Sequence, residues 1–184
     1  MPKTTDRLTV HIEMKPYLKA FLLSIYGDEP VFFPKRDKLN DLLQLLLVKP
    51  SKNHKPQKPD RKNSLEVILP YFENLNIYSY NHLSRRSQVS FVNFLKKRFW
   101  VTFEDFMNEC ARNGLLRSDA IDLFIEKYNL PYHSGIYDML NKATYRSKVI
   151  SKKYPTRQYH KRKKHNKSLS DNRVKIENEG NSGK

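Results

Sequence analysis

The sequence predicts a mainly α protein with a small α+β N-terminal unit, followed by a compact, helix-turn-helix-like helical domain and a basic tail. Three observations support this fold class. Apolar residues recur at helical spacing between residues 91 and 153, apolar and polar residues alternate near the N-terminus, and positive charge accumulates toward the C-terminus. We therefore divide the chain into a β-α-β-α unit at residues 1–50, a flexible basic linker at 51–64, a mainly helical domain at 65–153 and a basic, largely disordered tail at 154–184.

The N-terminal unit begins with a strand, because apolar and polar residues alternate from Leu8 to Lys15. Pro16 suits the first turn of a helix that Gly27 ends, and Val31–Phe33 between two prolines is typical of a short edge strand. Asp37 is placed to cap a second helix. So small a core is near the lower limit for independent folding, so we expect the unit to dock on the helical part or to form a homodimer. The apolar positions expected inside are Leu18, Phe21, Leu22 and Ile25 in the first helix and Leu39, Leu42, Leu43, Leu46 and Leu47 in the second.

The segment that joins the two structured parts reads as a loop and then a strand. Residues 49–63 are rich in Lys, Pro and Asn and hold no apolar side chain other than proline, so they cannot bury enough surface to order themselves. Leu65–Leu69 has strand character. Ile77–Tyr80 either returns as a second strand, or residues 71–80 are irregular and lead directly into the helices.

Four helices are expected in the central domain. The first spans Ser87–Phe99, Thr102 caps the second, Ser118 caps the third and Ser134 opens the fourth. Asn113-Gly114 ends the second helix, and the residue before Pro131 stops the third. The apolar positions expected inside are Val89, Phe91, Val92, Leu95 and Phe99, then Phe103, Phe106, Met107 and Cys110, then Ile121, Leu123, Phe124 and Ile125, and finally Ile136, Met139, Leu140 and Ala143.

Part of this domain has the spacing of a helix-turn-helix motif. A small residue, a glycine four positions later and apolar residues beyond are found at Cys110, Gly114, Leu115, Ala120 and Leu123. The third helix is nevertheless acidic and would repel phosphates, so the fourth helix is the better candidate to contact nucleic acid. A plain helical bundle with a basic tail remains the alternative.

A cationic run begins in the fourth helix. Residues 142–167 contain eleven Lys or Arg and no Asp or Glu. At about 100° per residue, Lys142, Arg146 and Lys153 lie on one strip of the helix, and Thr144, Tyr145 and Ser147 add hydrogen-bonding groups. Tyr145, Tyr154 and Tyr159 alternate with the cations, which is typical of surfaces that stack on single strands. The nucleic-acid-binding residues that we predict are Lys142, Arg146, Lys153, Arg157, Lys161, Arg162, Lys163 and Lys164.

Motifs of catalysis are missing from the sequence. It contains no Walker A, GxGxxG, GxSxG or HExxH pattern, and we expect neither a cofactor nor a metal. Asp119, Asp122 and Glu126 recur on one helical face, but no second carboxylate cluster accompanies them, so we interpret them as an exposed acidic face. Cys110, the only cysteine, is expected in the core rather than as a nucleophile.

Charge indicates the class of partner. The chain of 184 residues carries 35 Lys and Arg against 19 Asp and Glu, a net charge of +16, and its pI is near 9.8. This balance favours a non-enzymatic nucleic-acid-binding protein, with DNA favoured over RNA, such as a small DNA-binding regulator or accessory factor of a bacterium or mobile element. The alternatives are a structural or assembly protein of a phage or ribonucleoprotein, and a small metal-dependent nuclease. With one cysteine, no signal core and no membrane-spanning run, we expect a cytoplasmic, reducing location and no membrane partner.

Overall fold

The computed structural model describes residues 8–51, 63–132, 134–147, 150 and 154. The expected mainly α fold is confirmed, and residues 91–147 are mostly helical wherever they are described. The linker residues 52–62 and the tail residues 155–184 lie outside the described part. In chain order the elements are β1 (Thr9–Glu13), α1 (Pro16–Tyr26), α2 (Lys38–Leu46), β2 (Leu47–Val48), β3 (Ser64–Ile68), β4 (His82–Leu83), α3 (Arg85–Arg112), α4 (Arg117–Lys127) and α5 (Ser134–Arg146).

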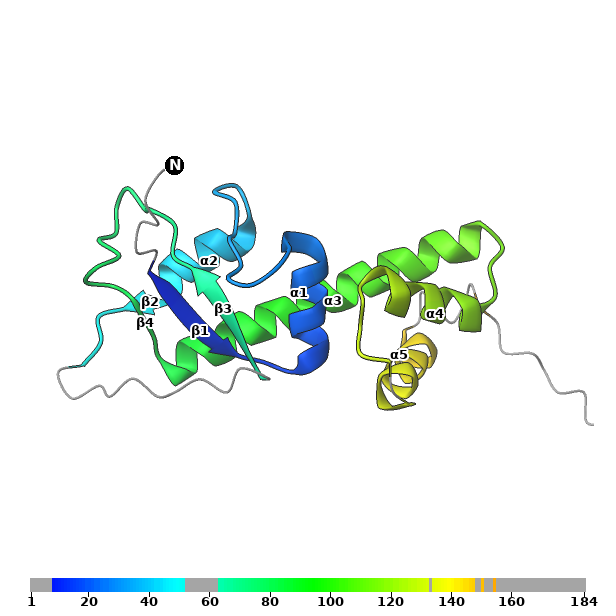
Figure 1. Cartoon of the computed structure of the whole chain (residues 1–184). Coiled ribbons are helices and arrows are strands. Elements are labelled where there is room, and N and C mark those ends of the chain that lie inside the picture. Colours follow the sequence, from blue (N-terminus) through cyan, green and yellow to red (C-terminus); the bar gives the residue numbers. More distant parts are fainter. Residues whose placement is uncertain (1–7, 52–62, 133, 148–149, 151–153, 155–184) are drawn as a thin grey trace, which may run out of the picture.

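Helix α3 is the longest element and extends between the two ends of the molecule (Figure 1). The strands, α1 and α2 surround its N-terminal half, whereas α4 and α5 pack beside its C-terminal half. The helix break expected between Phe99 and Thr102 is wrong. The Thr102 hydroxyl donates to the Arg98 carbonyl at 2.9 Å, four residues back in the same helix, and therefore does not cap a new one. Burial at residues 91, 95, 99, 103 and 107 gives α3 one continuous apolar stripe.

The strands form two small antiparallel sheets. In the larger one β1 pairs with β3, from Thr9 opposite Ile68 to Glu13 opposite Ser64, so the partner of the first strand comes from beyond the linker. The strand expected at Val31–Phe33 is reduced to a single parallel bridge between Val31 and Val67. Strand β2 pairs with β4. Of the two possibilities for residues 71–80, the irregular one is found, because this segment contains turns and one isolated bridge.

Gly27, Gly114 and Asp37 lie at helix ends as expected, whereas Ser118, like Thr102, does not cap a helix. Gly27 and Gly114 adopt positive φ angles of 89° and 74°, which glycine accepts without strain. The Asp37 carboxylate accepts from the Leu39 N–H at 2.8 Å and caps α2. Ser118 does not cap α4: the helix already begins at Arg117, and the Ser118 hydroxyl donates instead to the side chain of Asp119.

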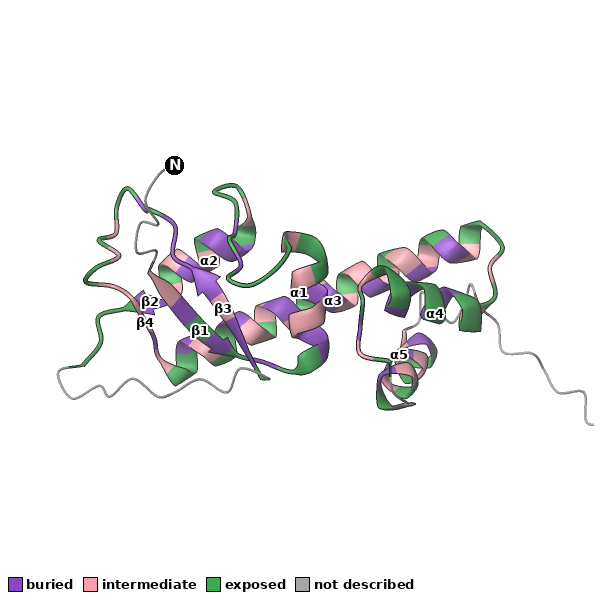
Figure 2. Ribbon diagram, viewed as in Figure 1, coloured by how far each residue is buried: buried purple, intermediate pink, exposed green. Residues whose placement is uncertain are grey.

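The core is one cluster of buried residues from β1 to α5, and it is rich in aromatic rings. Figure 2 shows buried positions along the strands and helices. The fully buried Phe99 ring lies 5.2 Å from the rings of Tyr17 and Phe21 of α1 and 5.7 Å from Phe124 of α4. Phe99 therefore connects the packing at the two ends of the molecule. Three side chains expected inside are exposed instead, because their helices turn them away from this core: Ile25, Val89 and Leu123.

No helix in the described part is both long and apolar enough to cross a membrane. Helix α3 has the length, but its 28 residues include charged side chains throughout.

Candidate nucleic-acid interface

Helix α5 presents the first cations of the basic run to solvent. Its buried positions Ile136, Leu140 and Thr144 follow one another at four-residue spacing and face the core. Lys142 and Arg146 lie away from this stripe and are exposed. The expectation that Thr144 faces a ligand is wrong, because its side chain is buried and its hydroxyl donates to the Asn141 carbonyl at 2.7 Å.

The chain beyond α5 is attached to the C-terminal half of α3. The Ser147 hydroxyl donates to the Glu104 carboxylate at 2.8 Å and so is occupied within the protein. Ile150 is buried, and the Tyr154 hydroxyl donates to the Met107 carbonyl at 3.2 Å. Ser147, Ile150 and Tyr154 therefore lie against the folded part. Of the residues predicted to bind nucleic acid, Lys153, Arg157, Lys161, Arg162, Lys163 and Lys164 lie outside the described residues.

An arginine and a tyrosine stack where α4 and α5 meet. The guanidinium carbon of Arg117, the first residue of α4, lies 4.0 Å from the centre of the Tyr145 ring of α5. An Arg117 N–H also donates to the Tyr145 hydroxyl. The pair is exposed, so it adds an aromatic and a cationic group to the surface next to Arg146. The sequence predicted an interleaving of tyrosine and cation, but not that the cation would come from α4.

The carboxylates of α4 are exposed, as expected. Asp119, Asp122 and Glu126 all face solvent. No group of three His, Cys, Asp or Glu side chains suited to holding a metal occurs among the described residues. The carboxylates therefore act on this surface as negative charge, which disfavours phosphate close to α4.

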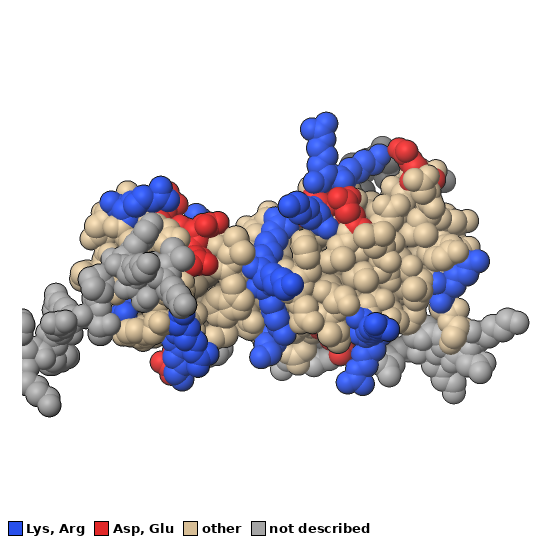
Figure 3. Space-filling view, turned by 180° about the vertical axis from the view of Figure 1, so that it is seen from behind, with Lys and Arg blue, Asp and Glu red and all other residues tan. Residues whose placement is uncertain are grey.

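Charge is distributed unevenly between the described part and the rest of the chain. The described residues include 16 Lys and Arg against 14 Asp and Glu, so they are nearly balanced, whereas the whole chain has a net charge of +16. Figure 3 shows Lys and Arg side chains gathered across the middle of one face, with Asp and Glu side chains beside them. Most of the positive excess therefore belongs to residues that lie outside the described part.

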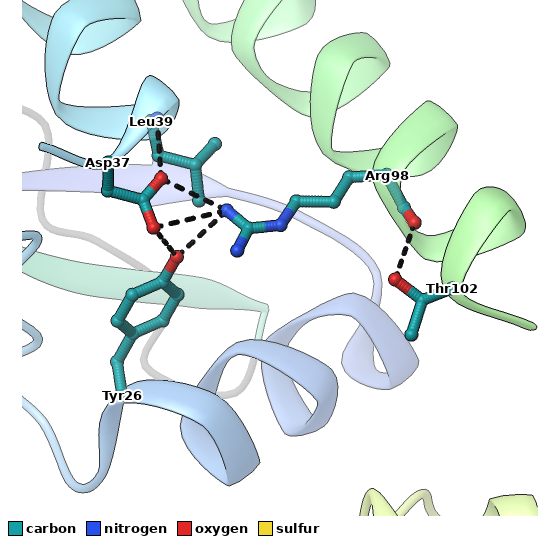
Figure 4. A network of polar contacts seen from close by, with 5 residues as sticks. All are labelled: Tyr26, Asp37, Leu39, Arg98 and Thr102. Carbon is teal, nitrogen blue, oxygen red and sulfur yellow. Dashed lines mark hydrogen bonds and ion pairs between the residues drawn. The ribbon is translucent and has the colours of Figure 1, made fainter. Parts of the chain in front are cut away.

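One arginine of the cluster at 96–98 points into the molecule rather than toward a partner (Figure 4). Arg98 of α3 donates to the Tyr26 hydroxyl at 2.8 Å and to the Asp37 carboxylate at 3.0 Å. The Tyr26 hydroxyl also donates to Asp37. This network of Tyr26, Asp37 and Arg98 joins α1, the start of α2 and α3, and sequence reasoning missed it.

The network shifts the pKa values of two of its members. Burial, together with the hydrogen bond to Asp37, raises the pKa of Tyr26 to about 12. Burial alone would raise the pKa of Asp37 as well. The hydrogen bonds from Tyr26 and from the Leu39 N–H and the charge of Arg98 together outweigh it, so the pKa of Asp37 is lowered. Asp37 is therefore ionised at neutral pH, and its charge is compensated within the fold.

Cys110 belongs to the core, as the sequence predicted. It is buried on the face of α3 that α4 covers, and burial followed by the charge of Glu109 raises the pKa of its thiol. A buried thiol with a raised pKa is a poor nucleophile at neutral pH.

Comparison of the chain with protein-family models, with curated proteins and with solved structures finds no match. The functional argument therefore depends on the residues and contacts described above.

Proposed function

We propose that this is a non-enzymatic nucleic-acid-binding protein that acts as a small DNA-binding regulator or accessory factor. The observation that carries the proposal is the run of eleven Lys or Arg without a carboxylate from residue 142 to residue 167, which begins on the exposed side of α5. Surfaces that only need to be soluble mix both signs of charge, as the described part does. A long run of one sign favours a polyanion as its partner.

The cations on α5 and those further along the run would contact a phosphate in different ways. Lys142 and Arg146 project from a helix that packs on the core, so folding sets their positions before any partner arrives. Two further residues of the run lie against the folded part: Ile150 is buried, and the Tyr154 hydroxyl donates to the Met107 carbonyl of α3. We therefore assign Lys142 and Arg146 to contacts of defined geometry, and the cations from Arg157 onward to attraction by charge.

The test is a binding titration at several salt concentrations with duplex DNA, single-stranded DNA and RNA. The whole chain is compared with a chain truncated after Pro155, which lacks nine Lys and Arg. We expect truncation to weaken binding to all sequences alike. On duplex DNA it should also reduce the salt slope by about 0.9 for each phosphate that the shorter chain no longer neutralises. Helical circular dichroism should be unchanged.

Two results would contradict the proposal. If the truncated chain binds as tightly and with the same salt slope, the run beyond Pro155 does not contact phosphate. If neither chain binds any nucleic acid at low salt, the protein is not a nucleic-acid binder.

The second candidate is an assembly protein whose tail packs against nucleic acid or an acidic partner. It is favoured by the near balance of charge in the described part, because a folded domain with little net charge is suited to contacts with other proteins. Binding that is stoichiometric and independent of base sequence would favour this function. Binding that discriminates between duplex sequences would favour the regulator.

A further inference from the structure

Three tyrosines gather where α4 meets α5. Tyr145 is 48% exposed and stacks with Arg117, and Tyr132, just before α5, is 75% exposed. Tyr137 lies between them in sequence, two turns before Tyr145, and is half-buried. We call the surface formed by Arg117, Tyr132, Tyr137 and Tyr145 the tyrosine platform.

Electrostatics indicates that these side chains are neighbours. Burial is the main cause that raises the pKa of Tyr137. Asp122, Tyr132 and Tyr145 raise it further, and Arg117 lowers it. Each of these groups must lie close enough to Tyr137 to act on its hydroxyl. Together with the stacking of Arg117 on the Tyr145 ring at 4.0 Å, this indicates that the platform is one surface.

The chemistry of the exposed rings indicates which ligand the platform would bind. Aromatic rings and guanidinium planes stack on the flat faces of unpaired nucleobases, and this stacking tolerates every base because each has a π-face. In a duplex the same faces are covered by neighbouring base pairs. Lys142 and Arg146 lie on the same helix and supply charge for the backbone of a strand whose bases lie on the rings.

The acidic groups around the platform restrict how a strand can lie. Asp122 is near Tyr137, and Asp138 is exposed on α5. Phosphates are repelled from these carboxylates. The backbone of a bound strand would therefore pass the Arg146 end of α5, with its bases over the tyrosines.

We propose that the tyrosine platform binds the unpaired bases of a single-stranded polynucleotide. The inference rests on the proposed nucleic-acid binding and adds its substrate class. It assigns to Tyr132 and Tyr145 a stacking role and to Arg117 the positioning of the Tyr145 ring. Tyr154, which the sequence placed among the stacking residues, is excluded, because its hydroxyl is engaged by Met107 and its side chain is largely covered.

The experiment measures binding of the whole chain to oligothymidylate of about 16 nucleotides, to oligouridylate of the same length and to a DNA duplex. The variant is Tyr132→Ala/Tyr145→Ala. We expect it to bind the single strands at least about 30-fold more weakly, because two stacked bases are lost. It should bind the duplex unchanged and keep its salt slope, because tyrosine neutralises no phosphate. The variant Tyr132→Phe/Tyr145→Phe keeps the rings and should bind single strands as the wild type does.

The matched control is Tyr71→Ala/Tyr78→Ala. These tyrosines are 73% and 77% exposed but lie in the segment between β3 and β4, away from α5, so their replacement should change neither affinity. Circular dichroism of each variant checks that the helices remain.

The outcomes separate this inference from the function on which it rests. Equal losses of affinity for oligothymidylate and oligouridylate support a platform that accepts either sugar, and a loss for one alone supports a platform selective for that sugar. If the wild type binds but the alanine variant loses no affinity, or loses as much for the duplex as for single strands, the platform does not take unpaired bases and the proposed function stands. If the wild type binds no nucleic acid at low salt, both fail.

Discussion

The two ends of α3 use their cations differently. Around its N-terminal half, Arg98 is held by Tyr26 and Asp37, and Lys19 forms an ion pair with Glu29 at 2.9 Å. Around its C-terminal half, Lys142 and Arg146 face solvent, and Arg117 lies on an exposed ring. Arg98 and Lys19 thus form ion pairs within the fold, whereas Lys142 and Arg146 remain accessible to a partner. Counting basic residues in the sequence cannot make this distinction, since it depends on which carboxylates the fold brings near them.

The largest expected effect is on stability and concerns Phe99, whose ring packs against helices at both ends of the molecule. Phe99→Ala would remove a ring that packs on α1 and α4 together, so it should lower the free energy of unfolding by about 3–5 kcal/mol. Urea denaturation followed by circular dichroism measures this change. Val101→Ala, at an exposed position of the same helix, is the control and should change stability by less than about 0.5 kcal/mol. A destabilisation by Phe99→Ala no greater than that of the control would show that the ring does not connect the two ends.

The next prediction concerns Asp37, which pairs with Arg98 at the N-terminal half of α3. Asp37→Ala would remove both the cap of α2 and the partner of Arg98, and should cost about 2 kcal/mol. Asp37→Asn would keep a capping oxygen but lose the charge, so it should cost about 1 kcal/mol. Denaturant midpoints at neutral pH measure both changes in stability. No destabilisation in Asp37→Asn would mean that the charge contributes nothing, and equal destabilisation in the two variants would mean that the cap contributes nothing.

The same network predicts how stability changes with pH. Because the folded state lowers the pKa of Asp37, its contribution is complete above the ordinary carboxyl pKa of about 3.9 and is lost as the pH falls below it. Because the folded state raises the pKa of Tyr26 to about 12, that contribution is complete below the ordinary pKa of about 10 and is lost as the pH rises from there toward 12. Stability curves of Asp37→Asn and Tyr26→Phe should be flatter than the wild type in the acid and the alkaline range respectively. Curves parallel to the wild type would contradict this assignment.

A smaller effect concerns the free cations at the other end. Arg146→Ala should weaken binding to duplex DNA about fivefold at low salt and reduce the salt slope by about 0.9, because one phosphate is no longer neutralised. If Arg146 reads a base edge instead, the affinity should fall by about 1–3 kcal/mol and unequally between sequences. Arg86→Ala, an exposed arginine in the first turn of α3, lies far from α5 and should leave binding unchanged. Equal weakening in both variants would show that binding depends on net charge rather than on α5.

The last prediction concerns the rate at which a thiol reagent labels Cys110. Its burial and raised pKa should keep it unreactive in the folded protein, and it should react once denaturant exposes it. Labelling under native conditions as fast as in denaturant would mean that the C-terminal half opens readily.

Local features of the fold could be predicted from the sequence, and distant partners could not. Asp37, Gly27 and Gly114 act within a few residues, so their capping and helix-ending roles were predicted. Thr102 satisfied the same local rule yet lies inside α3, because the apolar stripe continues through Phe99 and Phe103 and the hydroxyl bonds back to Arg98. A local signal therefore fails where tertiary burial continues across it.

The candidate site shows the same limit. Lys142 and Arg146 were predicted from helical spacing, and both are exposed. The burial of Thr144 and the stacking of Arg117 on Tyr145 depend on how α4 and α5 pack, which periodicity within one helix does not contain. The pairing of Arg98 with Asp37 spans 61 residues of sequence, and no local pattern indicates it.

The continuity of α3 also has a geometric consequence. At about 1.5 Å per residue, the 28 residues of α3 span about 42 Å, somewhat more than one turn of a DNA duplex. An unbroken helix fixes the rotational phase of its two ends as well as their spacing, since each residue turns the chain by about 100°. Groups attached at the two ends therefore keep one mutual orientation, and inserting a single residue in the middle of α3 would turn one end by more than a quarter of a revolution relative to the other.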